Sequence, residues 1–480
     1  MTGESIRQQT ISGVKWSSVE KFSTQGIHFI ISLILARLLT PEDFGTVGMT
    51  AVFLEICNTF LDSGFGKALA QKKDRTQVDY STVFYFNLIV SIVCYTLLFL
   101  AAPLIANFFK TPVLCSILRV QSLVLFTHAF MHIQSTILTI KLDFKNLAIR
   151  TLISAAIGGV AGIILAYMGF GVWAIVWQGL IGSTASMIFL WTFCGWKPSL
   201  VFSHDSFVKL FKFGGNILGA SLLNTIYRNL TSMVIGRFYT SADLGVYSRG
   251  VQFAKMPFNT IMGILGKVTF PILAKIQDDR EKLLEVYRKY IFSTSTIIFI
   301  CCTTLAACAK PLILLLLTNK WEGAIVYLQI FCIAVMFDHI TAINMNLIQA
   351  VGKSKLYFKA EIIKKIIGVA ILCVSVKFGV IAIALSKIVY SQSAIAIGIY
   401  FTSRTFNFSM LEQYRDFSKI LFYAVISSLP AYFIAESSLP LALSLALGVV
   451  TSFGIYYILQ RKNPYIKEVQ TLVWKALLKR

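Results

Sequence analysis

The sequence predicts an all-α integral membrane protein with about fourteen transmembrane helices arranged in two repeated halves. Three observations predict this fold class: an apolar composition, a succession of long apolar stretches, and an internal repeat. Of the 480 residues, 56% are hydrophobic and only 14% are charged, and the mean hydropathy is +0.72. Soluble chains are roughly a quarter charged, so lipid must be the solvent for most of this chain.

Charge clusters, prolines and glycines divide the chain into apolar stretches, each long enough for the roughly 20 residues that a membrane crossing needs. The links between them are short, so no extramembrane domain is expected. The polar start MTGESIRQQT is not followed by a signal-peptide cleavage site, so we expect the first span to direct insertion. The expected spans are 11–38, 44–66, 83–107, 113–138, 146–168, 171–194, 210–236, 241–265, 290–318, 323–350, 358–376, 378–402, 417–435 and 439–459.

The basic residues between the spans predict the topology. With a cytoplasmic N-terminus, 31 lysines and arginines fall on the inner side of the membrane and 6 on the outer side. Basic residues gather on the cytoplasmic side of membrane proteins, so both termini are expected to be cytoplasmic. Most of the net charge of +22 then reflects topology, and no nucleic-acid partner is expected.

A short charged corner, ARLLTPEDFG at residues 36–45, recurs as GRFYTSADLG at residues 236–245. Further along, FGVWAI and FGVIAI begin at Phe170 and Phe378. Six spans separate the copies, and an even number gives both copies the same orientation in the membrane. We therefore predict a six-helix lobe over 1–195, a second over 196–405, and two extra helices with a basic cytoplasmic tail over 406–480.

Polar side chains within the spans form stripes at helical spacing. A charge inside the bilayer costs several kcal/mol unless it faces a cavity or a partner, so the stripes should line a hydrated cavity between the lobes. The cations outnumber the acids within the spans, which suits an anionic ligand because lysine and arginine bind phosphate oxygens. The candidate substrate-binding residues are Arg228, Arg249, Lys255, Lys21, His28, Asn224 and Gln252.

The acids within the spans have two readings that the sequence leaves open. Glu55, Asp62 and Glu20 are either counter-ions to the cavity cations or carriers of a coupling proton or sodium ion. Lys21 is either a substrate ligand or the ion-pair partner of a glutamate in its own lobe. His128, His132, Asp338 and His339 are predicted to make polar contacts between helices, and Gly158 and Gly162 to allow close helix packing.

No enzyme is predicted. The sequence lacks an ATP-binding loop, an HExxH or GxSxG motif, and a large outer loop that could house a transferase or polymerase site. No cofactor or metal site is expected, and the nine cysteines are predicted to be buried apolar residues. Energy would come from a H⁺ or Na⁺ gradient, the membrane potential, or consumption of the product.

The repeated corner is predicted to have a structural role. Thr40 and Pro41 should start the second span, and Asp43 near its N-terminus suits the helix dipole. A second hypothesis is an outer gate formed by the pairs Arg37–Asp43 and Arg237–Asp243.

The stretch SGVKWSSVEKFSTQGIHFIISLILARLLTPEDFGTVGM, with GFG at 64–66, resembles the start of Wzx-type polysaccharide exporters. These belong to the multidrug/oligosaccharidyl-lipid/polysaccharide (MOP) flippase superfamily, and the likeness is greatest to the colanic-acid and teichuronic-acid branch. The resemblance implies MATE-like lobes working by alternating access. It also implies transfer of undecaprenyl-pyrophosphate-linked oligosaccharide across the bacterial inner membrane, for lipopolysaccharide or exopolysaccharide synthesis, alongside polymerase and chain-length machinery. Two alternatives stay open: a cation-coupled multidrug antiporter, and a membrane glycan polymerase.

Overall fold

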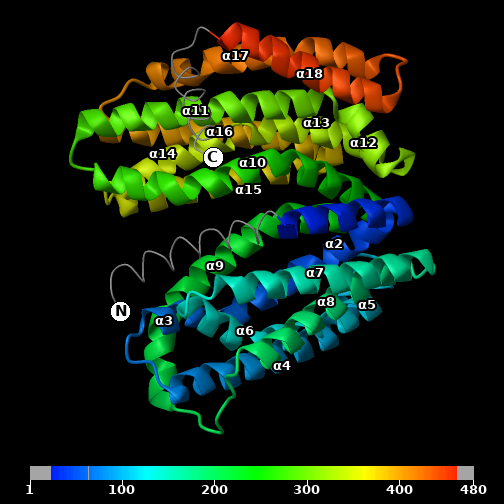
Figure 1. The fold of residues 1–480 in the computed structure, drawn as a ribbon, viewed down its shortest axis with the longest axis vertical. Coiled ribbons are helices and arrows are strands. Elements are labelled where there is room, and N and C mark those ends of the chain that lie inside the picture. Colours follow the sequence, from blue (N-terminus) through cyan, green and yellow to red (C-terminus); the bar gives the residue numbers. More distant parts are fainter. Residues whose placement is uncertain (1–22, 63, 462–480) are drawn as a thin grey trace, which may run out of the picture. The chain divides into compact units, whose positions relative to one another are not determined.

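The computed structural model describes residues 23–62 and 64–461, and all the regular secondary structure in those ranges is helical (Figure 1). The chain forms two compact units, the first ending at Gly245 and the second beginning at Val246. This division falls inside one helix, α10 (Ser241–Lys275). The lobes predicted from the sequence repeat are defined by similarity and not by compactness, so their boundaries at 195 and 405 stay a prediction.

Unit 1 contains a helix over Ser23–Leu38 and eight labelled helices that precede α10 among the described residues. In this unit α7 packs along α8, α2 packs along α9, and α6 packs against both α4 and α8. The labelled helices are α2 (Pro41–Asp62), α3 (Phe65–Gln71), α4 (Gln77–Phe108), α5 (Leu114–Gln121), α6 (Val124–Ile140), α7 (Phe144–Tyr167), α8 (Val172–Phe193) and α9 (His204–Phe238).

Unit 2 holds the rest of α10 and the helices that follow it. Here α11 packs along α17, α17 along α18, and α16 against both α14 and α15. The elements are α11 (Arg280–Ala307), α12 (Ala309–Leu317), η1 (Asn319–Trp321), α13 (Ala324–Val335), α14 (Asp338–Ala350), α15 (Ser354–Ser375), η2 (Val376–Phe378), α16 (Val380–Phe406), α17 (Met410–Glu436) and α18 (Leu441–Gln460).

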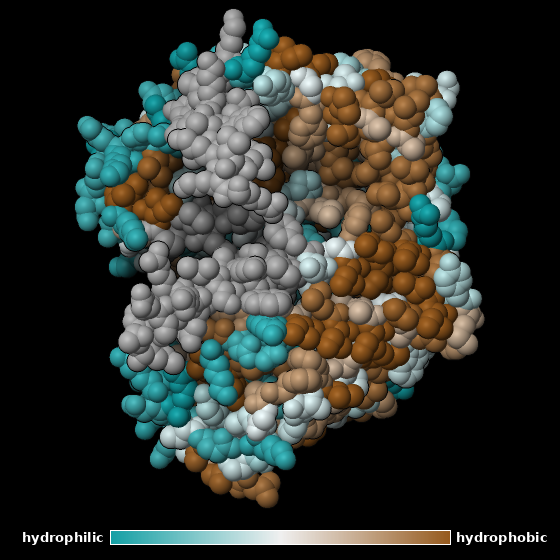
Figure 2. All heavy atoms as spheres, in the orientation of Figure 1, coloured by the Kyte–Doolittle hydropathy of each residue, from teal (hydrophilic) through white to brown (hydrophobic). Residues whose placement is uncertain are grey.

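Ten helical stretches in the described residues are long and apolar enough to cross a membrane, so the chain is a multi-pass membrane protein. The other expected spans coincide with Ser23–Leu38, α9, α10 and α15. The helices α9 and α10 each run for 35 residues, but their polar and charged side chains lower their hydropathy. In Figure 2, hydrophobic residues cover long stretches of the helices, and hydrophilic residues gather near helix ends. The total of fourteen spans and the side of the termini stay predictions.

Two expected spans are interrupted before the ends that the sequence predicts. The second span ends at Asp62 because Gly64 takes the left-handed conformation, with φ 75°, which an α-helix cannot include. The chain then restarts as α3. The ninth span breaks at Cys308, because Pro311 has no N–H to donate to the carbonyl of Ala307 and its ring crowds that turn.

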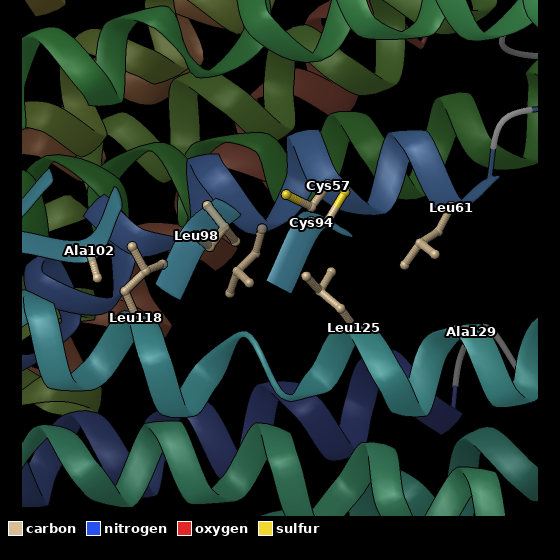
Figure 3. Packing of buried hydrophobic residues seen from close by; sticks show 9 residues of the cluster. Cys57, Leu61, Cys94, Leu98, Ala102, Leu118, Leu125 and Ala129 are labelled. Atoms are coloured by element: carbon tan, nitrogen blue, oxygen red, sulfur yellow. The ribbon is translucent and has the colours of Figure 1, made fainter. Parts of the chain in front are cut away.

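An apolar cluster fixes α2, α4, α5 and α6 to one another (Figure 3). Its members are buried, and the side chains of Cys57 and Cys94 point toward each other from α2 and α4. All nine cysteines are free thiols, and Cys373 is exposed, so the prediction of burial is wrong for that residue. The cluster consists of Leu54, Cys57, Leu61, Cys94, Leu98, Ala102, Leu118, Leu125 and Ala129.

Close packing between α7 and α8 confirms the role predicted for Gly158 and Gly162. A Cβ atom on Gly158 would lie 2.7 Å from the carbonyl oxygen of Gln178, and one on Gly162 would lie 2.8 Å from the Cβ of Gln178. Ser154 Oγ donates a hydrogen bond of 2.8 Å to the carbonyl of Gly182 across the same seam. Side chains larger than hydrogen at these glycines would force the helices apart.

The two copies of the charged corner pack against each other. A Cβ atom on Gly45 would overlap the carbonyl of Ser241, and one on Gly245 would overlap the carbonyl of Pro41. The N-terminal turns of α2 and α10 are therefore in backbone contact, and each glycine fits against the first residue of the other helix. This contact explains why glycine ends both copies.

Replacing Gly45 with alanine should therefore lower stability, because the new methyl group would overlap main-chain atoms of Ser241, which cannot move aside as a side chain can. Overpacking of this kind costs about 1–3 kcal/mol. Gly48→Ala is the matched control, since a Cβ there would meet Leu244 at an ordinary 3.5 Å. Thermal unfolding of the purified protein in detergent would measure both variants. Equal melting temperatures for the two would contradict the backbone contact.

Candidate functional site

A polar cleft of about 600 Å³ opens in unit 1 among α2, α3, α6 and α9. Six of its lining side chains carry hydroxyl groups, two are charged, and one is an imidazole. Two glycines, Gly64 and Gly66, expose main chain to it. The polar lining side chains are Thr59 and Asp62 on α2, His132, Ser135, Thr136 and Thr139 on α6, and Ser221, Thr225 and Arg228 on α9.

Helical spacing places the lining residues of each helix on a single face, so each helix forms one wall of the cleft. On α6, residues 132, 135, 136 and 139 repeat at intervals of three and four, so they share a face. On α9, Ser221, Thr225 and Arg228 do the same. Of the residues on these two walls, the sequence reasoning named Arg228 as a ligand and His132 as a helix contact, and it missed the hydroxyl residues of both stripes. The spacing of His132 from Ser135 and Thr139 was the signal that could have revealed the α6 stripe.

Arg228 and Glu55 join α9 to α2 at the cleft. The guanidinium donates to Glu55 Oε2 at 2.8 Å, and Asn229 Nδ2 donates to the same oxygen at 2.7 Å. The Arg228 side chain is 71% exposed and that of Glu55 is 43% exposed. Of the two readings of Glu55, this geometry provides the contact required for a counter-ion. Asn229 was not among the predicted residues.

Asp62 presents a carboxylate that is 81% exposed, and His132 Nε2 lies 3.6 Å from its Oδ1. The other ring nitrogen of His132 lies 3.1 Å from the amide nitrogen of Asn87. His128 Nδ1 lies 2.8 Å from Asn58 Oδ1. The polar contacts between helices that were predicted for both histidines are confirmed.

The remaining predicted residues of unit 1 lie at its surface. His28 and Asn224 are exposed, and neither lines the cleft. The predictions for Lys21 and Glu20 fall outside the described residues.

Three of the predicted substrate-binding residues lie on the part of α10 that belongs to unit 2. Arg249 is only 5% exposed, donates to Gln252 Oε1 at 2.8 Å, and places its guanidinium carbon 5.4 Å from the centre of the Trp321 ring. Gln252 and Lys255 are exposed. Trp321 was not predicted to be near Arg249, because η1 is far from α10 in the sequence.

Lys255 belongs to a charged group in unit 2. Lys255 attracts the carboxylate of Asp338 on α14 and repels the ammonium group of Lys387 on α16. Lys364 of α15 also acts on Asp338, is 6% exposed and forms an ion pair with Glu361. The sequence reasoning counted Lys364 among the basic residues of the inner side, although it falls within the expected span 358–376, and so missed it as a site residue. On the same α14, His339 Nε2 lies 2.8 Å from Ser295 Oγ, which confirms the polar contact predicted for it.

The two corners have the same hydrogen-bond pattern. Asp43 Oδ2 accepts from the main-chain nitrogen and the hydroxyl of Thr40 at 2.9 and 2.8 Å. Asp243 Oδ2 accepts from the same atoms of Thr240 at 3.1 and 2.7 Å. Each threonine and aspartate thus form a capping box that satisfies free N–H groups at a helix start. This is the structural role expected of the corner, in which α2 begins at Pro41.

The outer gate formed by the pairs Arg37–Asp43 and Arg237–Asp243 stays a prediction. Arg37 is exposed, and the guanidinium carbon of Arg237 lies 4.9 Å from the centre of the Phe108 ring. In the described ranges, no group of three or more histidine, cysteine, aspartate or glutamate residues is placed to hold a metal ion.

Comparison with known proteins places this chain. Residues 34–326, more than half of the chain, match the model of a family described as "Polysaccharide biosynthesis protein". The chain belongs to this family. Its relatives include the succinoglycan biosynthesis transport protein ExoT of Rhizobium meliloti, 26% identical over 66% of this chain and 65% of that protein. The match spans less than two thirds of the Rhizobium protein.

Two further relatives come from other bacteria. The lipopolysaccharide biosynthesis protein WzxC of Escherichia coli is 24% identical over 75% of this chain and 74% of its own length. The teichuronic acid biosynthesis protein TuaB of Bacillus subtilis is 24% identical over 74% of each chain. These matches confirm the resemblance to Wzx-type polysaccharide exporters and to their colanic-acid and teichuronic-acid branch.

Solved structures identify the fold. The lipid II flippase MurJ, in an inward closed conformation, matches with a TM-score of 0.72 at 15% identity, over 92% of this chain and 98% of that one. An inward-facing multidrug resistance MATE family transporter of the MOP superfamily matches with a TM-score of 0.63 at 16% identity, over 80% and 96%. The family member described here therefore has the fold of MOP-superfamily transporters.

Substitutions at two acids of unit 1 should differ in their effect on stability. Glu55→Gln removes an exposed ion pair, which is worth under about 1 kcal/mol. Asp79 at the start of α4 is fully buried and accepts from Lys72 at 2.7 Å, so Asp79→Asn should cost roughly 2 kcal/mol or more. Thermal unfolding in detergent would compare them. A larger loss for Glu55→Gln would show that the cleft ion pair is structural.

Proposed function

We propose that this protein is a flippase that moves undecaprenyl-pyrophosphate-linked oligosaccharide across the bacterial inner membrane, from the cytoplasmic leaflet to the outer leaflet. The observation that carries the proposal is the cleft of unit 1. It combines six hydroxyl side chains with an arginine among helices of a multi-pass membrane protein. Hydroxyls suit the sugars of such a substrate, and the arginine suits its phosphates.

The comparisons support the same function. The printed names of the relatives refer to succinoglycan transport and to the synthesis of lipopolysaccharide and teichuronic acid. The structure with the TM-score of 0.72 is a flippase of lipid II. The family, the fold and the cleft thus support transport of a lipid-linked glycan.

Arg228 would bind the pyrophosphate by exchanging partners. In the structure its guanidinium is held by Glu55 at 2.8 Å. A pyrophosphate carries more charge than one carboxylate and accepts two parallel bonds from a guanidinium, so it can displace Glu55. Arg249, Lys255 and Gln252 of unit 2 would supply further anion ligands, with Lys21, His28 and Asn224. The prenyl chain would stay in lipid.

The finer features of the mechanism belong to the same proposal. The two lobes would alternate access between the leaflets, with fourteen spans, both termini cytoplasmic, and the corners of Arg37 and Arg237 closing the outer mouth. A H⁺ or Na⁺ gradient would drive transport through Glu55, Asp62 or Glu20. Transport of this kind makes no covalent change, so the protein would not be an enzyme. A polymerase and chain-length machinery would consume the product.

A cation-coupled multidrug antiporter is the second candidate. The MATE transporter fold and the exposed carboxylate of Asp62 favour it. The two candidates predict opposite charge preferences, since drug antiporters bind lipophilic cations and the glycan flippase binds a lipid anion. The same vesicle preparation can therefore test both.

The deciding measurement is a flipping assay with the full-length protein in lipid vesicles. A fluorescent undecaprenyl-pyrophosphate glycan should become accessible to an external reductant or glycosidase faster than in protein-free vesicles. An imposed ion gradient should change that rate. Uptake of lipophilic cations without any glycan flipping would establish the antiporter instead.

Arg228→Ala and Lys255→Ala should each reduce flipping by about tenfold or more, since a charged hydrogen bond to phosphate contributes roughly 1.5–3 kcal/mol. Lys73→Ala, an exposed residue in the turn after α3, is the matched control and should keep the wild-type rate. The variants should melt near the wild-type temperature. Wild-type flipping by both alanine variants would remove these two residues from the site.

A further inference from the structure

The two ends of the unit 1 cleft differ in chemistry. On α2, Glu55, Thr59 and Asp62 follow at intervals of four and three, so they share a face. Seven residues of helix separate the two acids, which corresponds to about 10 Å along the axis. Arg228, paired with Glu55, stands at one end of the cleft, and Asp62, on the same helix as Glu55, stands at the other end.

Three threonine hydroxyl groups on the walls of the cleft are hydrogen-bond acceptors toward a ligand, because their protons are already donated to main-chain carbonyls. Thr59 donates its proton to the carbonyl of Glu55 at 2.7 Å, Thr136 to that of His132 at 2.9 Å, and Thr139 to that of Ser135 at 2.8 Å. A hydroxyl whose proton is committed to a carbonyl can still accept a hydrogen bond. Thr59 Oγ1 also lies 3.1 Å from Thr225 Oγ1, so part of its accepting capacity is used within the cleft. Thr136 and Thr139 therefore favour a ligand that donates hydrogen bonds.

Asp62 strengthens this preference. Its carboxylate is 81% exposed in the cleft and accepts hydrogen bonds only. His132 Nε2 lies 3.6 Å from Asp62 Oδ1, beyond hydrogen-bond distance, so the imidazole leaves the carboxylate open to a ligand. Two neighbouring hydroxyl groups of a sugar ring match the two carboxylate oxygens.

Two arginines described beside the cleft are engaged by other groups. Arg228 is bound to Glu55, at the other end of the cleft. Arg150 of α7 donates to Ser135 Oγ at 2.8 Å and does not itself line the cleft. Among the described lining residues, the charge exposed at the Asp62 end is therefore negative.

We propose that the Asp62 end of the cleft is a subsite for an uncharged, hydroxyl-rich sugar residue, and that it disfavours an anionic sugar such as a uronic acid. This inference rests on the proposed function, and it adds a substrate class to it. The pyrophosphate would lie toward Arg228, and a sugar of the same molecule would lie toward Asp62. The carboxylate would then determine which glycans are accepted.

Two matched substrates test the inference. Both are undecaprenyl-pyrophosphate disaccharides, and they differ only in the terminal sugar, which is glucose in one and glucuronate in the other. In vesicles with the full-length wild-type protein, the glucose probe should be flipped about fivefold faster, the size expected of one exposed like-charge contact. Asp62→Asn should bring the ratio close to one by speeding the glucuronate probe.

Asp278→Asn, an exposed aspartate in the turn after α10, is the matched control and should keep the wild-type ratio. Equal rates for the two probes with the wild-type protein would overturn the subsite, with the proposed function intact. An unchanged ratio in a folded Asp62→Asn protein would overturn it as well. If neither probe is flipped faster than in protein-free vesicles, the proposed function itself fails. The wild-type comparison needs no variant, so misfolding of Asp62→Asn cannot leave the question open.

Discussion

A bilayer core offers no hydrogen bonds, so a polar side chain on a membrane helix must find its partner within the protein or in a water-filled cleft. The polar residues of this chain follow that constraint. Arg228 is held by Glu55 and Asn229, and Arg249 by Gln252 beside the ring of Trp321. The helices α9 and α10 carry these arginines, and they are among the helices with too little hydropathy to qualify as spans on their own. Their position therefore depends on specific polar contacts as well as on lipid.

The fold class could be predicted from sequence because the preference for lipid adds up over each apolar stretch. Local backbone geometry could not. The second span was expected to run to residue 66, but Gly64 adopts φ 75° and a new helix follows it, so Gly64 and Gly66 belong to the wall of the cleft. Nothing in the hydropathy of this segment distinguishes a left-handed glycine from one within a helix. The repeat, in contrast, identified both corners, and each has the capping box that its threonine and aspartate allow.

The candidate site was predicted where the polar residues were charged, and missed where they were not. Glu55, Asp62 and Arg228 stand out within apolar helices, and the structure brings Glu55 and Arg228 into contact. Ser135, Thr136 and Thr139 did not stand out, because hydroxyl residues are common on membrane helices and usually bond to their own backbone. Lys364 was misread for another reason: it was counted with the basic residues of the inner side, although it lies in the middle of α15, where it is buried and paired with Glu361.

Gly64 and Gly66 give the cleft one wall made of main chain. A Cβ atom on Gly64 would lie 2.9 Å from the carbonyl of Gly214 on α9, and one on Gly66 would lie 3.2 Å from the hydroxyl of Thr136 on α6. That wall cannot vary without moving its neighbours, whereas side chains on the faces of α2, α6 and α9 that line the cleft can be exchanged one at a time. Under the proposed function, a lineage that switches to a different glycan would therefore change these three faces while keeping the glycines. The same scaffold could then serve many surface polymers, with recognition confined to three helix faces.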